Sequence, residues 1–300
     1  MKPSPHCLLQ ATRAVLSHEN PLGLPKTGSI PRFQRGLPQK RKIKDVAKVI
    51  AVSSAKGGVG KSTVAANLSL AFARQGFRSG ILDTDIFGPS IPTLFNLNEE
   101  PLLSANNQLV PLTNYGVKTM SIGYLVGEEA PLVWRGPMLL KAVQQLLHDV
   151  DWGGAGGLDI LVLDLPPGTG DTQLSIAQQI VLDGSVIVTT PHTLAVKDAV
   201  KGINMFRKVD VPILGLVQNM SVFRCPHCHG ATAVFGSSEG VRKVCEEHDM
   251  AFLGDVPLHP NIGEDGSRGK PTVVAEPASE RAKVFMDIAR AVGEKIGLVH

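Results

Sequence analysis

The sequence predicts an α/β protein whose doubly wound, mostly parallel sheet carries helices on both faces. Three observations lead to this fold class. Short, nearly continuous apolar runs alternate along the chain with longer stretches of helical spacing, which is typical of buried parallel strands joined by right-handed helical crossovers. A glycine-rich loop separates the first apolar run from the first helical stretch. The 300 residues, 43% hydrophobic and 19% charged, are enough for one large core.

Five apolar runs are expected to form the strands. The first, KVIAVSS (48–54), is rich in β-branched residues and ends at the glycine-rich loop. The others are RSGILDTD, LDILVLD, GSVIVTT and VPILGLV, at 78–85, 158–164, 184–190 and 211–217. These runs are nearly continuous rather than alternating, so both faces of the sheet should be covered.

Helical stretches fit between these strands and after the last one. The expected helices are 61–76, 137–148, 171–180, 194–208 and 280–296. The last of them gathers its apolar residues on one side: Val284, Phe285, Ile288, Val292 and Ile296. A membrane-surface anchor would need a basic polar face, whereas this polar face mixes acids with bases. We therefore expect the helix to pack on the core.

The first 44 residues differ from the rest in charge. They carry nine Lys/Arg and one acidic residue, whereas the remainder has 21 basic and 26 acidic residues. CLLQATRAVL (7–16) can form a short amphipathic helix, and six prolines make the leader a flexible lead-in. This pattern resembles a mitochondrial presequence, the alternative being a disordered basic tail without an address. We predict a disordered leader over 1–44 and a single folded domain over 45–300.

Composition argues against several classes of protein. No apolar run approaches the roughly 18 residues of a membrane span. The positive charge lies in the leader rather than on the folded body, which does not favour nucleic-acid binding. The four cysteines, Cys7, Cys225, Cys228 and Cys245, are too few and too unevenly spaced for a secreted disulfide framework. They indicate a reducing compartment.

The glycine-rich loop SSAKGGVGKST (53–63) has the composition and context of a phosphate-binding loop. Its glycines let backbone N–H groups face an anion, and the following helix adds the partial positive charge of its N-terminus. Lys61 is placed to reach the β- and γ-phosphates, Ser62 to offer a hydroxyl to Mg²⁺, and Thr63 to lie near the α-phosphate. The predicted nucleotide-binding residues are Ala55, Lys56, Gly57, Gly58, Val59, Gly60, Lys61, Ser62 and Thr63. Ala55 replaces the first glycine of the usual pattern, which is tolerable if its backbone angles are ordinary.

The loop AKGGVGKST (55–63) resembles the deviant Walker A loop of the Mrp/MinD family of P-loop ATPases. In that family the extra lysine, here Lys56, crosses a dimer interface to the phosphates held by the partner subunit. The resemblance implies a P-loop NTPase fold of the MinD type and a homodimer that encloses ATP with Mg²⁺. It extends from about residue 45 to the C-terminus.

The same resemblance assigns roles outside the loop. DTDIFGPS (83–90) corresponds to switch I, in which Asp85 positions the attacking water. DLPPGTGD (164–171) corresponds to Walker B and switch II, in which Asp164 holds Mg²⁺ through its water shell. Asn219 matches the position that touches adenine, while His192 stands where the family usually has glutamine. Lys56 and Asp85 are therefore the candidate catalytic residues.

Cys225 and Cys228 form a CPHC motif at metal-ligand spacing, for which three interpretations are open. A redox pair would need the strand–turn–helix context of thioredoxin, which is missing. A zinc site within one chain would add Cys245 and His248, although Cys245 shares a helical side with Val241 and also suits the core. A two-fold dimer would join two cysteine pairs and supply the four thiolates of a 4Fe–4S cluster.

NMSVFRCPHC (219–228) resembles the cysteine motif of the family's iron–sulfur carriers, in which the cluster bridges subunits. With the leader and DTDIFGPS, the likeness is greatest to a mitochondrial branch that serves the assembly of respiratory complex I. It implies a carrier in the mitochondrial matrix that passes a 4Fe–4S cluster to apo-proteins, hydrolyses ATP slowly, binds no nucleic acid and makes at most peripheral membrane contact. The rival hypothesis is a MinD/ParA-like positioning ATPase with a structural zinc site on Cys225, Cys228, Cys245 and His248.

Overall fold

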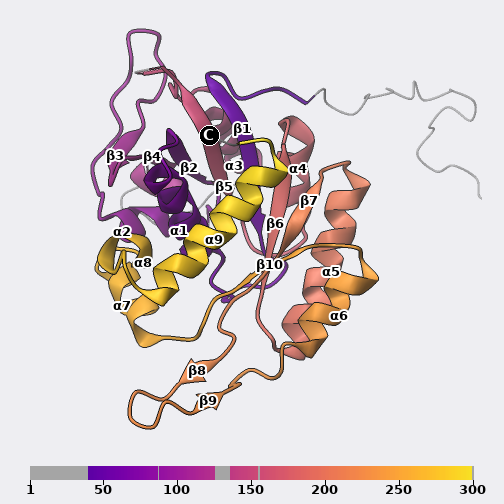
Figure 1. Cartoon of the computed structure of the whole chain (residues 1–300). Coiled ribbons are helices and arrows are strands. Elements are labelled where there is room, and N and C mark those ends of the chain that lie inside the picture. The colour runs from indigo at the N-terminus through magenta and orange to yellow at the C-terminus, as the bar shows by residue number, and fades with distance from the viewer. Residues whose placement is uncertain (1–39, 87, 126–135, 155, 299–300) are drawn as a thin grey trace, which may run out of the picture. The chain divides into compact units, whose positions relative to one another are not determined.

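The computed structural model describes residues 40–86, 88–125, 136–154 and 156–298. Among these residues it has an eight-stranded sheet in the order β10-β7-β6-β1-β5-β2-β4-β3 (Figure 1). Neighbouring strands are parallel, except that β3 runs antiparallel to β4. The strands are β1 (Val46–Ser53), β2 (Ser79–Asp83), β3 (Leu112–Asn114), β4 (Val117–Ser121), β5 (Leu158–Asp164), β6 (Gly184–Thr189), β7 (Ile213–Gln218) and β10 (Phe252–Asp255).

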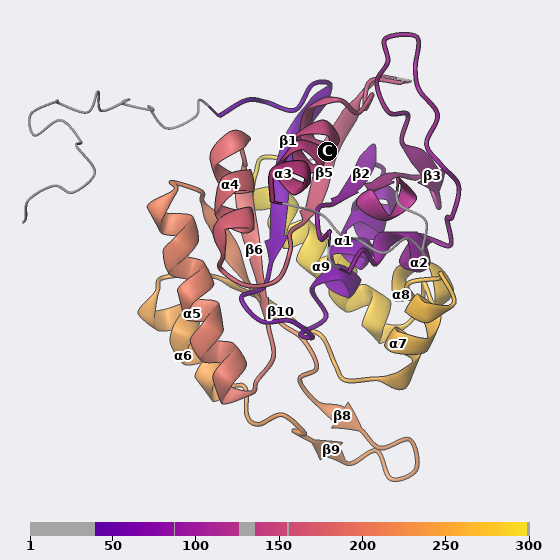
Figure 2. The same ribbon diagram turned by 180° about the vertical axis from the view of Figure 1, so that it is seen from behind.

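Helices cover both faces of the sheet, as the two opposite views show (Figures 1 and 2). One face carries α1 (Lys61–Arg74), α2 (Ile91–Phe95), α7 (Pro260–Ser267), α8 (Thr272–Ala275) and α9 (Glu280–Lys295). The other carries α3 (Gly136–His148), α4 (Asp171–Gln179), α5 (Thr193–Lys208) and α6 (Glu239–Glu247). A short hairpin, β8 (Phe223–Arg224) with β9 (Ala231–Thr232), is separate from the sheet.

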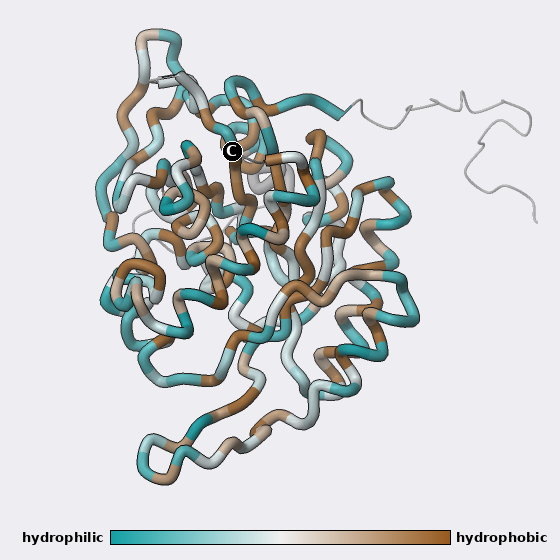
Figure 3. Tube along the Cα trace, in the orientation of Figure 1, coloured by the Kyte–Doolittle hydropathy of each residue, from teal (hydrophilic) through white to brown (hydrophobic). Residues whose placement is uncertain are grey.

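The sheet separates two hydrophobic cores. Ile50 and Val52 of β1 belong to the core under α1 and α9, whereas Val49 and Ala51 belong to the core under α3 and α5. Successive side chains of a strand point to opposite faces, so a strand covered on both faces needs apolar residues at every position. This explains the continuous apolar runs, which Figure 3 shows as hydrophobic segments along the central strands.

The predicted doubly wound α/β architecture is confirmed. All five predicted strands and all five predicted helices are present, with ends that differ by a few residues, and β5 coincides with the predicted 158–164. The prediction missed β3, β4 and β10, and the short helices α2, α7 and α8. Each of these elements has eight residues or fewer and is too short for a clear period of 2 or 3.6. β3 and β4 also contain Thr, Asn and Lys at positions where the inner strands are apolar.

The packed part of the chain begins before the predicted boundary at Asp45. The Arg41 N–H donates to the Gln179 carbonyl at 2.8 Å, and Ile43 is buried in the core under α3. This hydrogen bond and this buried side chain attach the last residues of the proposed leader to the folded domain. The presequence-like helix at 7–16 and Cys7 lie outside the described residues.

The terminal helix α9 packs on the core, as its pattern predicts. Phe285, Ile288 and Val292 are fully buried, and Ile296 is nearly so. No helix among the described residues is long and apolar enough to cross a membrane.

Replacing Phe285 with alanine should lower the free energy of unfolding by about 3–5 kcal/mol, because the lost ring leaves a cavity between α9 and the sheet. The effect can be measured by urea denaturation followed by circular dichroism. Glu294, exposed on the same helix, provides the control, since Glu294→Ala should change stability by less than about 0.5 kcal/mol. Equal, small effects at the two positions would show that α9 does not pack as described.

Candidate functional site

The phosphate-binding loop connects the end of β1 to the start of α1. Gly58 and Gly60 have φ angles of 78° and 82°, in the left-handed region that favours glycine. A Cβ at Gly60 would collide with Nδ2 of Asn219, whereas one at Gly57 or Gly58 would meet nothing within 4 Å. Gly60 is thus required for packing, and the space in front of Gly57 and Gly58 suits an anion approaching the backbone.

The departure from the usual loop pattern at Ala55 is accommodated. Ala55 is not among the residues with positive φ, so its backbone is in an ordinary region, as the sequence interpretation required. Its methyl group lies beside Gly202 of α5. Even a Cβ built on Gly202 would be 3.6 Å from this methyl group, an ordinary van der Waals distance, so Ala55 is not crowded. The neighbouring Ser54 hydroxyl donates to the Lys56 carbonyl at 3.0 Å and closes the start of the loop.

A buried ion pair lies at the centre of the site. Nζ of Lys61 is 2.5 Å from Oδ1 of Asp164 and 3.2 Å from Oγ of Ser62, and the side chains of Lys61 and Asp164 are 6% and 0% exposed. Oδ2 of Asp164 is buried and has no hydrogen-bond partner among the residues that the structure describes. A buried carboxylate oxygen next to a hydroxyl has the ligand chemistry that Mg²⁺ or its bound water requires. These residues therefore fit a metal–phosphate group.

Asp83 is a buried residue of the site that the sequence interpretation did not assign. It stands opposite Asp164 on the neighbouring strand, and burial, followed by the charge of Asp164, raises its pKa to about 7. Its carboxylate accepts hydrogen bonds from the N–H groups of Asp85 at 2.9 Å and Ser90 at 3.1 Å, and from the Ser121 hydroxyl at 3.1 Å. Asp83 thus orders the loop that carries Asp85. The sequence signal that could have identified Asp83 is its position at the end of an apolar strand.

The turn after β5 is held against the phosphate-binding loop. The Gly168 N–H donates to the Ser54 carbonyl at 2.9 Å. Gln173 of α4, only 1% exposed, donates to the Pro166 carbonyl and accepts from the Ser53 hydroxyl at 3.2 Å. The sequence interpretation missed Gln173, because a single glutamine in a helix has no distinctive spacing.

Lys56 occupies the rim of the site. Its side chain is half-buried, and its charge contributes to lowering the pKa of Asp198 on α5, a shift caused mainly by a hydrogen bond from Lys201. Lys61, which follows three glycines and one valine later, instead turns inward to Asp164. The two lysines of the loop therefore have different environments.

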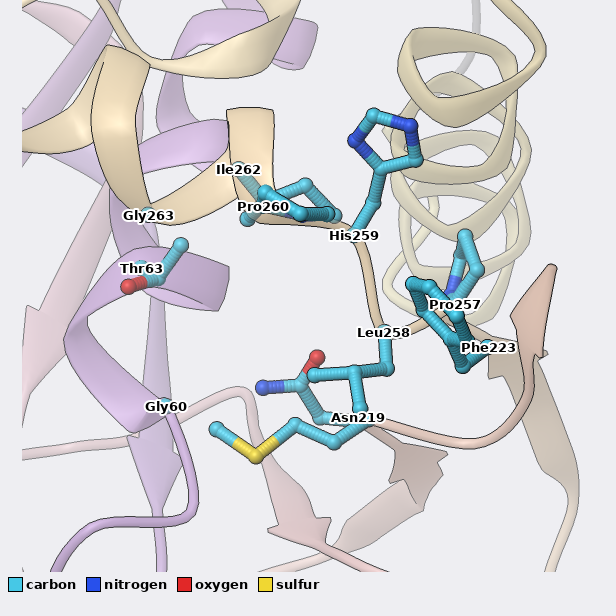
Figure 4. Close-up of a pocket in the computed structure, with 11 residues that line it drawn as sticks. Gly60, Thr63, Asn219, Phe223, Pro257, Leu258, His259, Pro260, Ile262 and Gly263 are labelled. Atoms are coloured by element: carbon cyan, nitrogen blue, oxygen red, sulfur yellow. The ribbon is translucent and has the colours of Figure 1, made fainter. Parts of the chain in front are cut away.

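A cavity of about 440 Å³ lies beside the loop, as Figure 4 shows. Gly60 and Thr63 line one side of it. The other side is formed by two segments, the start of the β8 hairpin and the chain that follows β10: Asn219, Met220, Phe223, Pro257, Leu258, His259, Pro260, Ile262 and Gly263. Nδ2 of Asn219 donates to the Val59 carbonyl at 2.8 Å and so fixes the edge of the cavity to the loop. The size lies within the range of small-molecule sites.

Cys225 and Cys228 lie in the turn between β8 and β9. Cys225 is half-buried and Cys228 is exposed, and neither forms a disulfide. The Cys225 N–H donates to the Gly230 carbonyl at 3.0 Å, and the His229 N–H donates to the Cys225 carbonyl at 2.9 Å. Hydrogen bonds from the backbone N–H groups of Cys228 and His227 lower the pKa of the Cys225 thiol. Such N–H groups favour the thiolate that binds metals.

The zinc site of the rival interpretation is not formed. Cys245 is 5% exposed in the core beside Val241, while Nδ1 of His248 lies 3.2 Å from the Arg207 guanidinium. Within the described residues, no three His, Cys, Asp or Glu side chains are grouped as metal ligands. Cys245 lies on the buried face of α6, as expected for a core cysteine that shares a helical side with Val241. The zinc site of Cys225, Cys228, Cys245 and His248 is therefore wrong for the single chain.

A family model described as "ParA: NUBPL iron-transfer P-loop NTPase" matches residues 45–293. The chain belongs to this family. It is 53% identical over 266 residues to the iron-sulfur cluster transfer protein NUBPL of Mus musculus, covering 88% of this chain and 82% of that protein. It is 48% identical over 252 residues to the iron-sulfur protein required for NADH dehydrogenase, mitochondrial, of Arabidopsis thaliana, covering 84% of this chain and 79% of that protein.

A solved structure agrees with this membership. The nucleotide-binding protein of Archaeoglobus fulgidus, in complex with ADP, superposes with a TM-score of 0.68 at 35% identity, covering 80% of this chain and 93% of that one. The predicted family resemblance and the predicted fold class are confirmed. In this chain, the CPHC hairpin and the phosphate-binding loop belong to one folded unit.

The thiols of this family member should differ in reactivity. Cys225 should be alkylated by iodoacetamide at a lower pH than a free cysteine, because its lowered pKa preserves the reactive thiolate as the pH falls. Burial raises the pKa of Cys245 and shields it, so it should react slowly below its raised pKa. Peptide mass spectrometry of the metal-free chain across pH 6–9 measures both rates. Faster labelling of Cys245 than of Cys225 would contradict the described hairpin.

Proposed function

We propose that this protein is an ATP-dependent carrier of iron–sulfur clusters. A homodimer would bind a 4Fe–4S cluster between two Cys225–Cys228 pairs and pass it to apo-proteins, among them subunits of respiratory complex I in the mitochondrial matrix. One observation carries the proposal: in a member of an iron-transfer NTPase family, a half-buried and an exposed cysteine share a hairpin whose first strand borders the cavity beside the phosphate-binding loop, and N–H groups are directed at the Cys225 thiol.

The cysteine pair is half of a ligand set. A 4Fe–4S cluster takes four thiolates, and among the described residues no third His, Cys, Asp or Glu side chain is grouped with Cys225 and Cys228 as a metal ligand. Two-fold symmetry would bring two such pairs together without any further residue type. Gly230 leaves room at the Cys228 thiol, because a Cβ there would lie only 3.3 Å from its Sγ. Only two ligands per subunit also make release possible when the interface opens.

The nucleotide would bind along the loop and into the cavity. Backbone N–H groups of the loop, from Ala55 to Thr63, would surround the phosphates, with Lys61 moving from Asp164 to the β- and γ-phosphates. Mg²⁺, held by Ser62 and through water by Asp164, would neutralise phosphate charge. Asn219 would contact the adenine at the edge of the cavity, where it already lies against Val59.

Hydrolysis would depend on the dimer. Lys56 at the rim would reach the phosphates bound by the partner subunit, and Asp85 would position the attacking water. Phosphoryl transfer needs positioning and charge stabilisation rather than covalent help from the protein. The hydrogen bond from the Asp85 N–H to Asp83 supports this role, since it fixes the loop on which Asp85 lies. We expect slow turnover, with ATP acting mainly as a switch that tightens and loosens the dimer around the cluster.

The experiment that tests the function is anaerobic reconstitution of the full chain with iron and sulfide. Iron, sulfide and zinc are counted, and the mass of the loaded species is measured by light scattering. We expect about four iron and four sulfide per dimer. Iron-loaded material that is strictly monomeric would contradict the shared cluster, and one zinc per monomer would favour the positioning ATPase.

The client is tested by transfer from the loaded dimer. The acceptor is an apo subunit of complex I that carries a four-cysteine cluster site, and the signal is the appearance of its electron paramagnetic resonance spectrum after reduction. Transfer should be faster from the dimer than from free iron and sulfide in the presence of a chelator. Equal rates would remove the carrier role.

A further inference from the structure

We propose that Phe223 is a positioning residue that couples occupancy of the cavity beside the phosphate-binding loop to the state of the Cys225–Cys228 pair. The inference rests on the proposed function, because it needs a nucleotide in the cavity and a cluster on the hairpin. It adds a route of control within one chain, separate from closure of the dimer through Lys56.

Phe223 belongs to both sites. It lines the cavity opposite Gly60 and Thr63, as Figure 4 shows. It is also the first residue of β8, where it pairs with Thr232 of β9, and it precedes Cys225 by two positions. One wall of the cavity and the base of the cysteine hairpin are therefore the same short strand.

The hairpin and the second wall segment are joined by backbone contacts. The Leu258 N–H donates to the Val222 carbonyl at 3.1 Å, the Ser221 N–H donates to the Val256 carbonyl at 3.1 Å, and Phe223 forms a parallel bridge with Leu258. Leu258 itself lines the cavity. The first leg of the hairpin and the chain after β10 thus form one hydrogen-bonded unit that faces the loop and α1 across the cavity.

Both ends of the hairpin region are fixed by hydrogen bonds. Asn219 is held on the phosphate-binding loop through Val59, and Gln218 donates to Ser238 at 2.7 Å, where the hairpin returns to α6. Met220 follows Asn219 with a φ of 56°, a left-handed conformation that is uncommon for a non-glycine residue. Phe223 and Cys225 lie between these anchors, on the segment through which a change at the cavity would reach the cysteine pair.

A nucleoside in the cavity would touch the loop on one side and Phe223 on the other. It would therefore favour the conformations of β8 in which Phe223 contacts the nucleoside. A ligand shifts a conformational equilibrium only when it binds one conformation more tightly than the other. Coupling of this kind is reciprocal: the factor by which ADP changes the affinity of the cysteine pair for its cluster is also the factor by which the cluster changes the affinity for ADP. Typical couplings correspond to about fivefold or more.

The test uses the full chain and ADP, which avoids hydrolysis. The alkylation rates of Cys225 and Cys228 by iodoacetamide are measured in the metal-free chain with and without saturating ADP, by peptide mass spectrometry. ADP affinity is measured by calorimetry for the metal-free and the cluster-reconstituted chain. The variants are Phe223→Ala, Phe223→Leu as a milder change, and Phe235→Ala. Phe235 is an exposed aromatic residue of the same hairpin region that does not line the cavity, so it is the matched control.

We expect ADP to change the alkylation rate at least about fivefold, in either direction, in the wild type and in Phe235→Ala, and less than twofold in Phe223→Ala. Phe223→Leu should give an intermediate change. A wild-type rate that is insensitive to bound ADP overturns the inference, and so does full sensitivity in Phe223→Ala or its loss in Phe235→Ala. Failure of the wild type to bind ADP, or to load iron, is a different result and contradicts the proposed function instead.

Discussion

Replacing Lys61 with alanine should weaken the binding of ADP with Mg²⁺ by about 100-fold or more, equivalent to about 3 kcal/mol. Lys61 is the cation of the loop that lies inside the site, where its 6% exposure means that its charge is little screened by water. Its removal also leaves the buried carboxylate of Asp164 without its ion-pair partner. Calorimetry at constant Mg²⁺ measures the affinity.

In Lys61→Ala the buried Asp164 has lost its ion-pair partner, so a loss of stability must be separated from a loss of ADP binding. Breaking a buried ion pair costs about 3–5 kcal/mol in the free energy of unfolding, so Lys61→Ala should be less stable by urea denaturation. The double variant Lys61→Ala/Asp164→Asn removes the buried charge and should recover most of that stability without recovering ADP binding. Lys56→Ala should retain ADP binding in the single chain, because Lys56 lies at the rim. Tight ADP binding by a folded Lys61→Ala would contradict the assigned site.

The parts of this protein that the sequence predicts are those with long or dense local signals. Each predicted inner strand is a run of seven or eight residues with an apolar centre. The loop has three glycines and two lysines at a single strand–helix junction. Such features are set by neighbours in the chain. The fold class and the loop could therefore be predicted before any tertiary contact was known.

The missed features depend on contacts between distant segments. Asp83 matters because strand register places it opposite Asp164, and Gln173 matters because α4 brings it to Ser53, 120 positions away. The wall of the cavity at 257–263 has no motif and is recognised only where it faces the loop. The two interpretations of Cys245 stayed open for the same reason, since spacing alone does not distinguish a ligand from a core residue on an amphipathic helix.

Replacing Cys225 with alanine should abolish loading of the iron–sulfur cluster, from about four iron per dimer to background, and with it the visible colour. The side chain lies in the turn of a short hairpin outside the main sheet, so its loss should change the free energy of unfolding by less than about 0.5 kcal/mol. Iron analysis, the visible absorption spectrum and urea denaturation of the same preparation measure the three quantities.

Cys245→Ala is the matched control, because it removes the same group from the core. It should keep the full complement of iron and lose about 1 kcal/mol of stability, the reverse of Cys225→Ala. The contrast depends on burial: a thiol at 5% exposure contributes packing, whereas a thiol in an open turn contributes a ligand. Full iron in Cys225→Ala, or lost iron in Cys245→Ala, would mean that the cluster is bound by a different set of residues, and the two-fold arrangement of cysteine pairs would have to be abandoned.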